Sequence, residues 1–191
     1  MRAAAFWKAV VVDGADLLER TLAFLADNRA RYCVVDGQAV NAYVEPLVSL
    51  DLDLAVAADH LPDLEALLGR SFQVTRFPHS LNVSVPGSDL RVQFQTDPRY
   101  ADFVERAAPR EVLGRELPVA TLEDVLQGKL WAVQDRQRRP SQRQKDMADI
   151  ARIIEAHPEL RDRVPQEVLE KLVWRADHAD SVRTESVEVT L

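Results

Sequence analysis

Hydrophobic positions along the chain follow two different periods, which predicts a protein that mixes helices and strands. Apolar residues recur every three or four positions, as in amphipathic helices, in residues 15–28, 61–68, 121–139, 142–156 and 165–176. Apolar and polar residues alternate, as in half-buried strands, in residues 49–57, 72–77, 80–85 and 90–95. A β-branched run predicts a buried strand over residues 31–35, and residues 38–43 suit a helix that begins directly after Gly37. The predicted order is a helix, a mixed α/β middle and a helical C-terminal third.

Turn and capping residues mark several boundaries between these elements. Gly69 is expected to end the helix before it, and residues 86–89, Pro-Gly-Ser-Asp, to form a turn between two strands. Thr121, followed by two acidic residues, is expected to cap the helix that begins there.

Composition limits the class of protein. A chain of 191 residues, 47% of them hydrophobic, can bury one sizeable core. The apolar N-terminal stretch is interrupted by Lys8 and Asp13, which argues against a membrane span. Cys33 is the one cysteine, so no intramolecular disulfide can form, and a reducing cytoplasm is the simplest expectation. The formal net charge of −7 argues against nonspecific nucleic-acid binding over the whole surface but permits a local basic patch.

Two aspartates occupy the same face of one predicted strand. Residues two apart in a strand point the same way and lie roughly 6.6 Å apart, so Asp51 and Asp53 share a face while the leucines between and around them enter the core. Paired carboxylates repel unless a cation neutralises them, and Mg²⁺ prefers such oxygen ligands. A solvated edge strand with alternating polar residues is an equally good interpretation of the pair alone.

Gly37 shifts the balance between these two interpretations. A strand that runs through Gly37 straight into a helix places free backbone N–H groups near the carboxylate face, which favours phosphate. A phosphate site beside paired carboxylates is a typical layout for metal-assisted phosphoryl or nucleotidyl transfer.

Taken together, these motifs resemble the minimal nucleotidyltransferases of the DNA polymerase β-like superfamily. The nearest resemblance is to the bacterial branch of abortive-infection and toxin–antitoxin nucleotidyltransferases. It covers roughly residues 31–155, and the matching positions are Asp36-Gly37-Gln38-Ala39, Tyr43, Ser49, Asp51, Asp53, Lys129, Arg136 and Lys145-Asp146-Met147-Ala148-Asp149.

The resemblance implies a fold and a division of the chain. The fold would be an α/β nucleotidyltransferase core, a small mixed sheet flanked by helices, with a C-terminal helical part. Residues 1–120 would form the core, residues 121–177 the helical part of the same compact unit, and residues 178–191 a loose tail.

The resemblance also implies an activity, the Mg²⁺-dependent transfer of an NMP from an NTP to a hydroxyl acceptor on RNA or protein. Asp51 and Asp53 would hold the metal, and Gln93 would fill the third ligand position. The NTP phosphates would contact Gly37, Gln38, Ser49 and Lys129.

Three positions depart from the pattern of active relatives. Asp36 stands where the family usually has a second small residue, and its expected role is to cap the following helix. Leu47 and Val48 stand where a basic residue is common. Gln93 stands where a third carboxylate is typical, and it brings an amide oxygen without charge. These departures favour an alternative function, a catalytically silent binding or regulatory module, for example one half of a toxin–antitoxin pair with a partner protein.

Other charged residues admit two interpretations each. Lys129 either contacts phosphate or is solvated. The dense basic run is by default a solvated loop, and secondly a patch for RNA or nucleotide phosphates; its members are Arg136, Arg138, Arg139, Arg143 and Lys145. Asp146 and Asp149, three apart on one helix face, are expected to fix nearby arginines rather than to bind metal.

Overall fold

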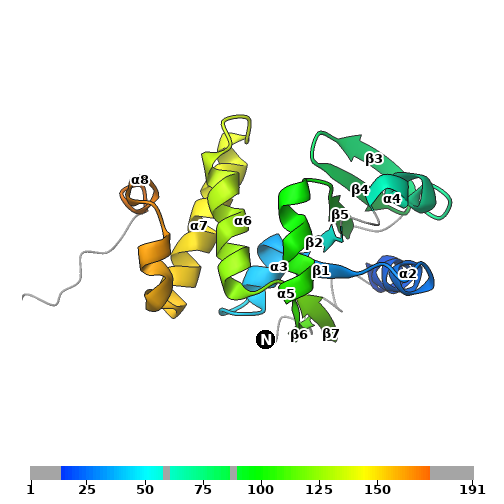
Figure 1. Ribbon diagram of the computed structural model, residues 1–191, viewed down its shortest axis with the longest axis horizontal. Coiled ribbons are helices and arrows are strands. Elements are labelled where there is room, and N and C mark those ends of the chain that lie inside the picture. Colours follow the sequence, from blue (N-terminus) through cyan, green and yellow to red (C-terminus); the bar gives the residue numbers. More distant parts are fainter. Residues whose placement is uncertain (1–13, 58–60, 87–89, 173–191) are drawn as a thin grey trace, which may run out of the picture.

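A seven-stranded mixed β-sheet runs through the middle of the protein (Figure 1). The computed structural model describes residues 14–57, 61–86 and 90–172. The strand order is β3-β4-β5-β2-β1-β7-β6. The strands are β1 (Tyr32–Val35), β2 (Asp51–Val56), β3 (Gln73–Phe77), β4 (Ser80–Ser84), β5 (Arg91–Gln95), β6 (Ala108–Val112) and β7 (Arg115–Val119). β2 pairs with β5 in parallel and with β1 antiparallel, so the aspartate-bearing strand lies at the centre of the sheet.

Helices flank this sheet, and the C-terminal ones gather on the side of α3 (Figure 1). α3 contacts α6 and α7, and α6 packs against α7. The helices are α2 (Gly14–Asp27), α3 (Asp36–Asn41), α4 (Leu61–Leu68), α5 (Ala101–Arg106), α6 (Leu122–Gln134), α7 (Pro140–Ala156) and α8 (Gln166–Leu169), with 3-10 turns η2 (Pro98–Tyr100) and η3 (Pro158–Arg163). None of the helices in the described ranges is both long and apolar enough to span a bilayer.

The alternating pattern of β2 explains its central position. Leu52 and Leu54 are completely buried in the core, as the sequence predicts, because they point away from the aspartate face. β1 supplies Cys33 and Val34, which are also completely buried, and burial raises the pKa of the Cys33 thiol to about 12. Cys33 is thus a small core residue rather than a reactive thiolate.

Several predicted boundaries are confirmed. Gly69 follows the last residue of α4, and the hydroxyl of Thr121 accepts a hydrogen bond from the Asp124 amide at the start of α6. The predicted helix over 165–176 is wrong in its length, since α8 ends at Leu169 and the chain turns there. The apolar N-terminal stretch up to residue 13, turn residues 87–89 and the tail from 173 onward lie outside the described residues.

The β6–β7 hairpin was not predicted. Its turn places Leu113 at φ 55° and Gly114 at φ 77°, the left-handed pair that a two-residue hairpin requires. Glycine adopts this conformation freely, whereas leucine rarely does, so the Leu-Gly dipeptide carries a weak turn signal. The hairpin adds two strands beyond β1 and makes the mixed sheet larger than expected.

Candidate active site

Strand register sets Asp53 and Gln93 side by side. In the parallel pair of β2 and β5, Asp53 lies opposite Gln93 and Asp51 lies opposite Arg91. In the antiparallel pair of β4 and β5, Gln93 lies opposite Asn82. Residues opposite one another in a sheet share a face. Asp53, Gln93 and Asn82 therefore form one polar row across three strands.

A polar cavity of about 190 Å³ lies over this row. The structure thus brings together three of the residues predicted for the site, Asp51, Asp53 and Gln93. The helical side supplies the facing wall from the α6–α7 connection and the first turns of α7. The full lining is Asp36, Asp51, Asp53, Asn82, Arg91, Gln93, Arg138, Gln142, Lys145 and Asp146.

Asp53 carries an incompletely neutralised charge. Its side chain is only 8% exposed. Burial raises the pKa of the Asp53 carboxyl well above its usual range, and the carboxylates of Asp36 and Asp51 raise it further against the opposing effect of Lys129. An ionised Asp53 therefore needs an additional cation in the cavity.

The cavity suits a hard divalent cation. Its lining includes the carboxylates of Asp51 and Asp53 and the amide side chains of Gln93 and Asn82, which offer oxygen donors of the kind that Mg²⁺ prefers. The Asn82 Oδ1 atom is buried and has no hydrogen-bond partner among the described residues. An unpartnered buried acceptor beside an undercompensated carboxylate fits a cation site.

Asp51 is held by an arginine from the neighbouring strand. Arg91 Nη2 lies 2.8 Å from Asp51 Oδ1, and both side chains are substantially exposed. An exposed ion pair of this kind contributes at most about 1 kcal/mol. Arg91 contacts one of the two carboxylate oxygens of Asp51, so a metal ion that takes Asp51 as a ligand would compete with Arg91 for its negative charge.

Replacing Arg91 should therefore favour metal binding. In Arg91→Gln, Asp51 loses its competing cation, and we expect a several-fold lower Mg²⁺ concentration for half-maximal thermal stabilisation, with a metal-free melting temperature within a few degrees of wild type. Arg76→Gln, which breaks the exposed pair with Glu65 far from the cavity, is the matched control. An unchanged Mg²⁺ midpoint in Arg91→Gln would contradict competition between Arg91 and the metal for Asp51.

Asp36 does not cap α3, contrary to the sequence-based prediction. α3 begins at Asp36 itself, its N-cap is Val35, and no side chain caps it. The Asp36 carboxylate instead bonds the Lys129 ammonium from α6. Asp36 has φ 56°, a left-handed conformation that a glycine adopts more readily. The aspartate thus occupies a backbone position suited to glycine, and its side chain turns to an ion pair.

Lys129 lies beneath the cavity rather than in its lining. The side chain is 2% exposed, and its Nζ contacts the carboxylates of Asp36, Asp146 (3.1 Å) and Asp149 (2.8 Å). Burial alone would lower the pKa of Lys129, but the three carboxylates raise it, so the ammonium stays charged. Burial alone would raise the pKa of the Asp36 carboxyl, but Lys129 together with Arg138 and Lys145 outweighs this effect, so the pKa is lowered.

Asp146 and Asp149 also fix arginines, as predicted. Asp146 pairs with Arg138, and Asp149 pairs with Arg152 at 2.8 Å. The three acidic residues Asp36, Asp146 and Asp149 have carboxylate oxygens within 4.8 Å of one another, a spacing that a metal ion could use. In this structure the Lys129 ammonium occupies that position. We call these six residues the Lys129 cluster: Asp36, Lys129, Arg138, Asp146, Asp149 and Arg152.

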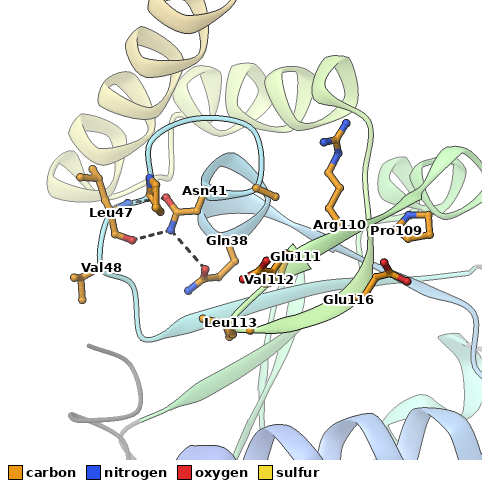
Figure 2. Close-up of a pocket in the computed structure, with 13 residues that line it drawn as sticks. Gln38, Asn41, Leu47, Val48, Pro109, Arg110, Glu111, Val112, Leu113 and Glu116 are labelled. Atoms are coloured by element: carbon orange, nitrogen blue, oxygen red, sulfur yellow. Dashed lines mark hydrogen bonds between the residues drawn. The ribbon is translucent and has the colours of Figure 1, made fainter. Parts of the chain in front are cut away.

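The four residues predicted to contact phosphate do not lie together in one site. Ser49 Oγ lies 3.9 Å from the position that a Cβ on Gly37 would take, so these two are neighbours at the start of α3. Gln38 is buried, and its amide donates to the Ser49 carbonyl at 3.0 Å. Gln38 therefore fixes the Ser49 backbone, and its side chain lines a different cavity (Figure 2).

The basic run divides among three places. Arg138 and Lys145 line the carboxylate cavity. Arg139, the N-cap of α7, is exposed and lines neither this cavity nor the next. Arg136 and Arg143 line another cavity between α6, α7 and α8. The default interpretation as a uniformly solvated loop therefore does not describe Arg138, which is tied to Asp146.

Sequence reasoning missed several lining residues. Asn82 has the alternation parity of a site residue within its strand, but only strand order shows that β4 lies next to β5. Arg91 likewise shares the parity of Gln93, two residues away. Gln142 carries no signal in the sequence, because its position depends on how α7 packs.

The central mixed sheet, the paired carboxylates and the helical wall define a nucleotidyltransferase fold. The sequence of residues 54–190 matches the family described as nucleotidyl transferase AbiEii toxin, type IV toxin–antitoxin system. The chain belongs to this family, which supports nucleotidyl transfer and a toxin–antitoxin context. The match begins directly after Asp53. No curated protein has a sequence that matches the chain.

Solved structures with a similar arrangement include antibiotic-modifying proteins. The antibiotic-resistance factor ANT(2'')-Ia has 14% identity and a TM-score of 0.47, over 81% of this chain and 94% of that chain. The lincosamide antibiotic adenylyltransferase LnuA, solved with lincomycin, has 11% identity and a TM-score of 0.47, over 71% and 95%. A nucleotidyltransferase-like protein from Paracoccidioides brasiliensis has 18% identity and a TM-score of 0.46, over 69% and 70%. These similarities are too distant to indicate a substrate.

Proposed function

We propose that the protein transfers an NMP from an NTP to a hydroxyl group of an RNA or protein acceptor, with Mg²⁺ as the cofactor. The observation that carries this proposal is the undercompensated Asp53 carboxyl, set beside Asp51 and Gln93 in a cavity that Arg138 and Lys145 also line. Carboxylates together with cations in one cavity suit a metal-bound triphosphate. We also place the protein in the reducing cytoplasm, in keeping with its single cysteine.

The residues in and around the cavity would have different roles. Asp51, Asp53 and the Gln93 amide oxygen would hold Mg²⁺, which when bound would neutralise charge on the triphosphate. Lys145 and Arg138, which line the cavity, would contact phosphate oxygens, as would the Gly37 backbone and Ser49 at the start of α3. Lys129, predicted to contact phosphate, would act indirectly by fixing Asp36 and Asp146.

The reaction itself is a substitution at the α-phosphorus. The acceptor hydroxyl would lose its proton to solvent and its oxygen would form a bond to the α-phosphorus, while the bond between the α-phosphorus and the oxygen that bridges to the β-phosphate breaks and pyrophosphate leaves. Positive charge near the leaving group stabilises the negative charge that develops there. Arg138 and Lys145 are the cavity residues placed to supply it.

Label transfer tests this proposal. NTPs labelled at the α-phosphate are incubated with the protein, Mg²⁺ and either total RNA or a protein extract, and labelled macromolecules are counted. We expect Mg²⁺-dependent labelling of one acceptor class that Asp53→Asn abolishes and that Asp162→Asn, an exposed aspartate in η3, leaves intact. Labelling that survives Asp53→Asn would refute the mechanism.

Gln93→Asp should strengthen the metal site. The new carboxylate would lie directly opposite Asp53, and two charges about 5 Å apart at an effective dielectric constant of about 20 repel by roughly 3 kcal/mol. We expect a melting temperature several degrees lower without metal, restored or exceeded with Mg²⁺, and transfer at least equal to wild type. Gln95→Asp, two residues along the same strand, is the control. A lower melting temperature with no rescue by Mg²⁺ would contradict the metal site.

A second candidate function is a catalytically silent binding or regulatory module. Three observations favour it: Lys129 is enclosed by carboxylates, Arg91 pairs with Asp51, and Gln93 brings no charge. Calorimetric titration with ATP and with CTP, each with and without Mg²⁺, separates the two functions. Tight metal-dependent binding supports the enzyme, and no binding at millimolar nucleotide supports the module and a partner protein.

A further inference from the structure

The segment between α3 and β2, residues 42–50, contains no helix or strand. Its two ends pack against the core through Ala42, Tyr43, Val44 and Leu50, whereas residues 45–48 are exposed. The segment carries Ser49 toward Gly37 on one side. Its other side borders a cavity of about 520 Å³ shared with the β6–β7 hairpin (Figure 2). Leu47 and Val48 are 56% and 59% exposed, so apolar burial holds this part of the segment only weakly. Polar contacts must therefore set its position.

Asn41, the last residue of α3, supplies the first of these contacts. Its amide nitrogen donates to the Leu47 carbonyl at 2.7 Å, and its amide oxygen accepts from the Leu47 N–H at 3.0 Å. Figure 2 shows this side chain between Leu47 and Gln38. Gln38 then holds the Ser49 carbonyl two residues further along. The two amide side chains of α3 thus bind the segment at successive positions.

Arg152 supplies the second contact from a distant helix. From α7 it donates to the Asn41 Oδ1 atom at 3.0 Å and to the Glu45 carbonyl at 2.6 Å. Its guanidinium is held at the other end by Asp149 at 2.8 Å, and Asp149 lies 2.8 Å from Lys129. A planar guanidinium can make these bonds at once in a fixed geometry. The segment is therefore fastened to the Lys129 cluster beneath the carboxylate cavity.

We infer that Arg152 is a positioning residue for the phosphate-binding edge of the site. Arg152 is linked to the cavity-lining carboxylates of Asp36 and Asp146 only indirectly, through Asp149 and Lys129. It acts by holding residues 45–49 so that Ser49 stays against the start of α3. This inference rests on the proposed function. α7 would then have a second role besides supplying cavity residues, namely to hold the loop that follows α3.

Hydrogen exchange and kinetics together test this role. Arg152→Gln removes both the charge and the planar guanidinium that donates to several acceptors. Arg152→Lys keeps the charge but can form only some of these hydrogen bonds. We expect about tenfold faster amide exchange in residues 45–49 of Arg152→Gln, no change in β2, and a smaller change in Arg152→Lys. We also expect kcat/KM for the NTP to fall by about 10- to 100-fold, mainly through KM. Asn41→Ala should reproduce the local exchange effect.

Arg163→Gln, an exposed arginine in η3, is the matched control and should leave both measurements unchanged. Unchanged exchange in residues 45–49 of Arg152→Gln would overturn the inference. Faster exchange spread over β1 and β5 would also overturn it, because a global loss of stability would then explain the kinetics. A wild-type protein without transfer activity would refute the proposed function, and the exchange rates of the loop would still decide whether Arg152 holds it.

Discussion

Asp53→Asn is expected to raise the melting temperature of the metal-free protein at neutral pH while it abolishes nucleotidyl transfer. The asparagine has nearly the shape of the protonated aspartic acid but no charge to bury. Because the pKa of Asp53 is raised in the folded state, ionisation of this group favours unfolding. Ionisation of a buried carboxyl whose pKa is raised well above its usual range costs on the order of 1 kcal/mol or more of folding free energy, and about 1 kcal/mol moves the melting temperature of a protein of this size by roughly 2–4 °C. We therefore expect a gain of at least about 3 °C at pH 7.5 in EDTA.

The same variant gives a pH dependence with a definite sign. A raised folded pKa means that the contribution of wild-type Asp53 to stability is fully present below its unfolded pKa, about 3.9, and is lost as the pH rises toward the folded value. Wild type and Asp53→Asn should therefore melt together near pH 3.5 and diverge as the pH rises. Saturating Mg²⁺ should stabilise only the wild type. Scanning calorimetry measures both effects, and a variant that melts below wild type at pH 7.5 without metal would contradict the charge assigned to this site.

Lys129→Met is expected to be the most destabilising single substitution in this part of the protein. The Lys129 cluster contains three cations and three carboxylates. Removing its central ammonium leaves three carboxylates facing one another in a buried site, and breaking a buried pair costs about 3–5 kcal/mol. At roughly 2–4 °C per kcal/mol, the melting temperature should fall by about 6–20 °C, with lost nucleotide binding as a consequence.

A second substitution separates charge balance from loss of packing. Lys129→Met with Asp36→Asn restores equal numbers of opposite charges and should recover a substantial part of the melting temperature. Lys171→Met, an exposed lysine outside the cluster, should melt like wild type. If the double variant is no more stable than Lys129→Met, the cost comes from packing around the lysine stem rather than from uncompensated carboxylates.

Alternation along single segments was enough to predict much of the fold. The Asp-Leu-Asp pattern placed Leu52 and Leu54 in the core and the aspartates on one face, because the period of a strand is local. The capping hydroxyl of Thr121 and the helix stop at Gly69 are local as well. The β6–β7 hairpin was not predicted because its turn contains Leu113, a residue type that is strained in the conformation that the turn requires.

The candidate site was predicted only where strand period or the family resemblance sufficed. Gln93 was identified by the resemblance to nucleotidyltransferases, which typically have a carboxylate between hydrophobic residues of a neighbouring strand, but its partner Asn82 depends on which strands are neighbours. The position of Lys129 depends on Asp146 and Asp149, which follow 17 and 20 residues later on another helix. Asp36 was expected at a helix cap because aspartate is a common capping residue. Its ion pair with Lys129 is a tertiary contact that no local pattern reveals.

The Lys129 cluster has a consequence for the order in which the protein is made. Asp36 emerges from the ribosome early, Lys129 much later, and Asp146 and Asp149 only when α7 has been synthesised. Until then Lys129 lacks two of its three carboxylates, and the wall that carries Arg138 and Lys145 is missing. Contacts between residues so distant in sequence form late in folding. A nascent chain therefore holds Asp51 and Asp53 long before it holds a finished cavity, and any function that needs the whole cavity begins only after α7 has been made.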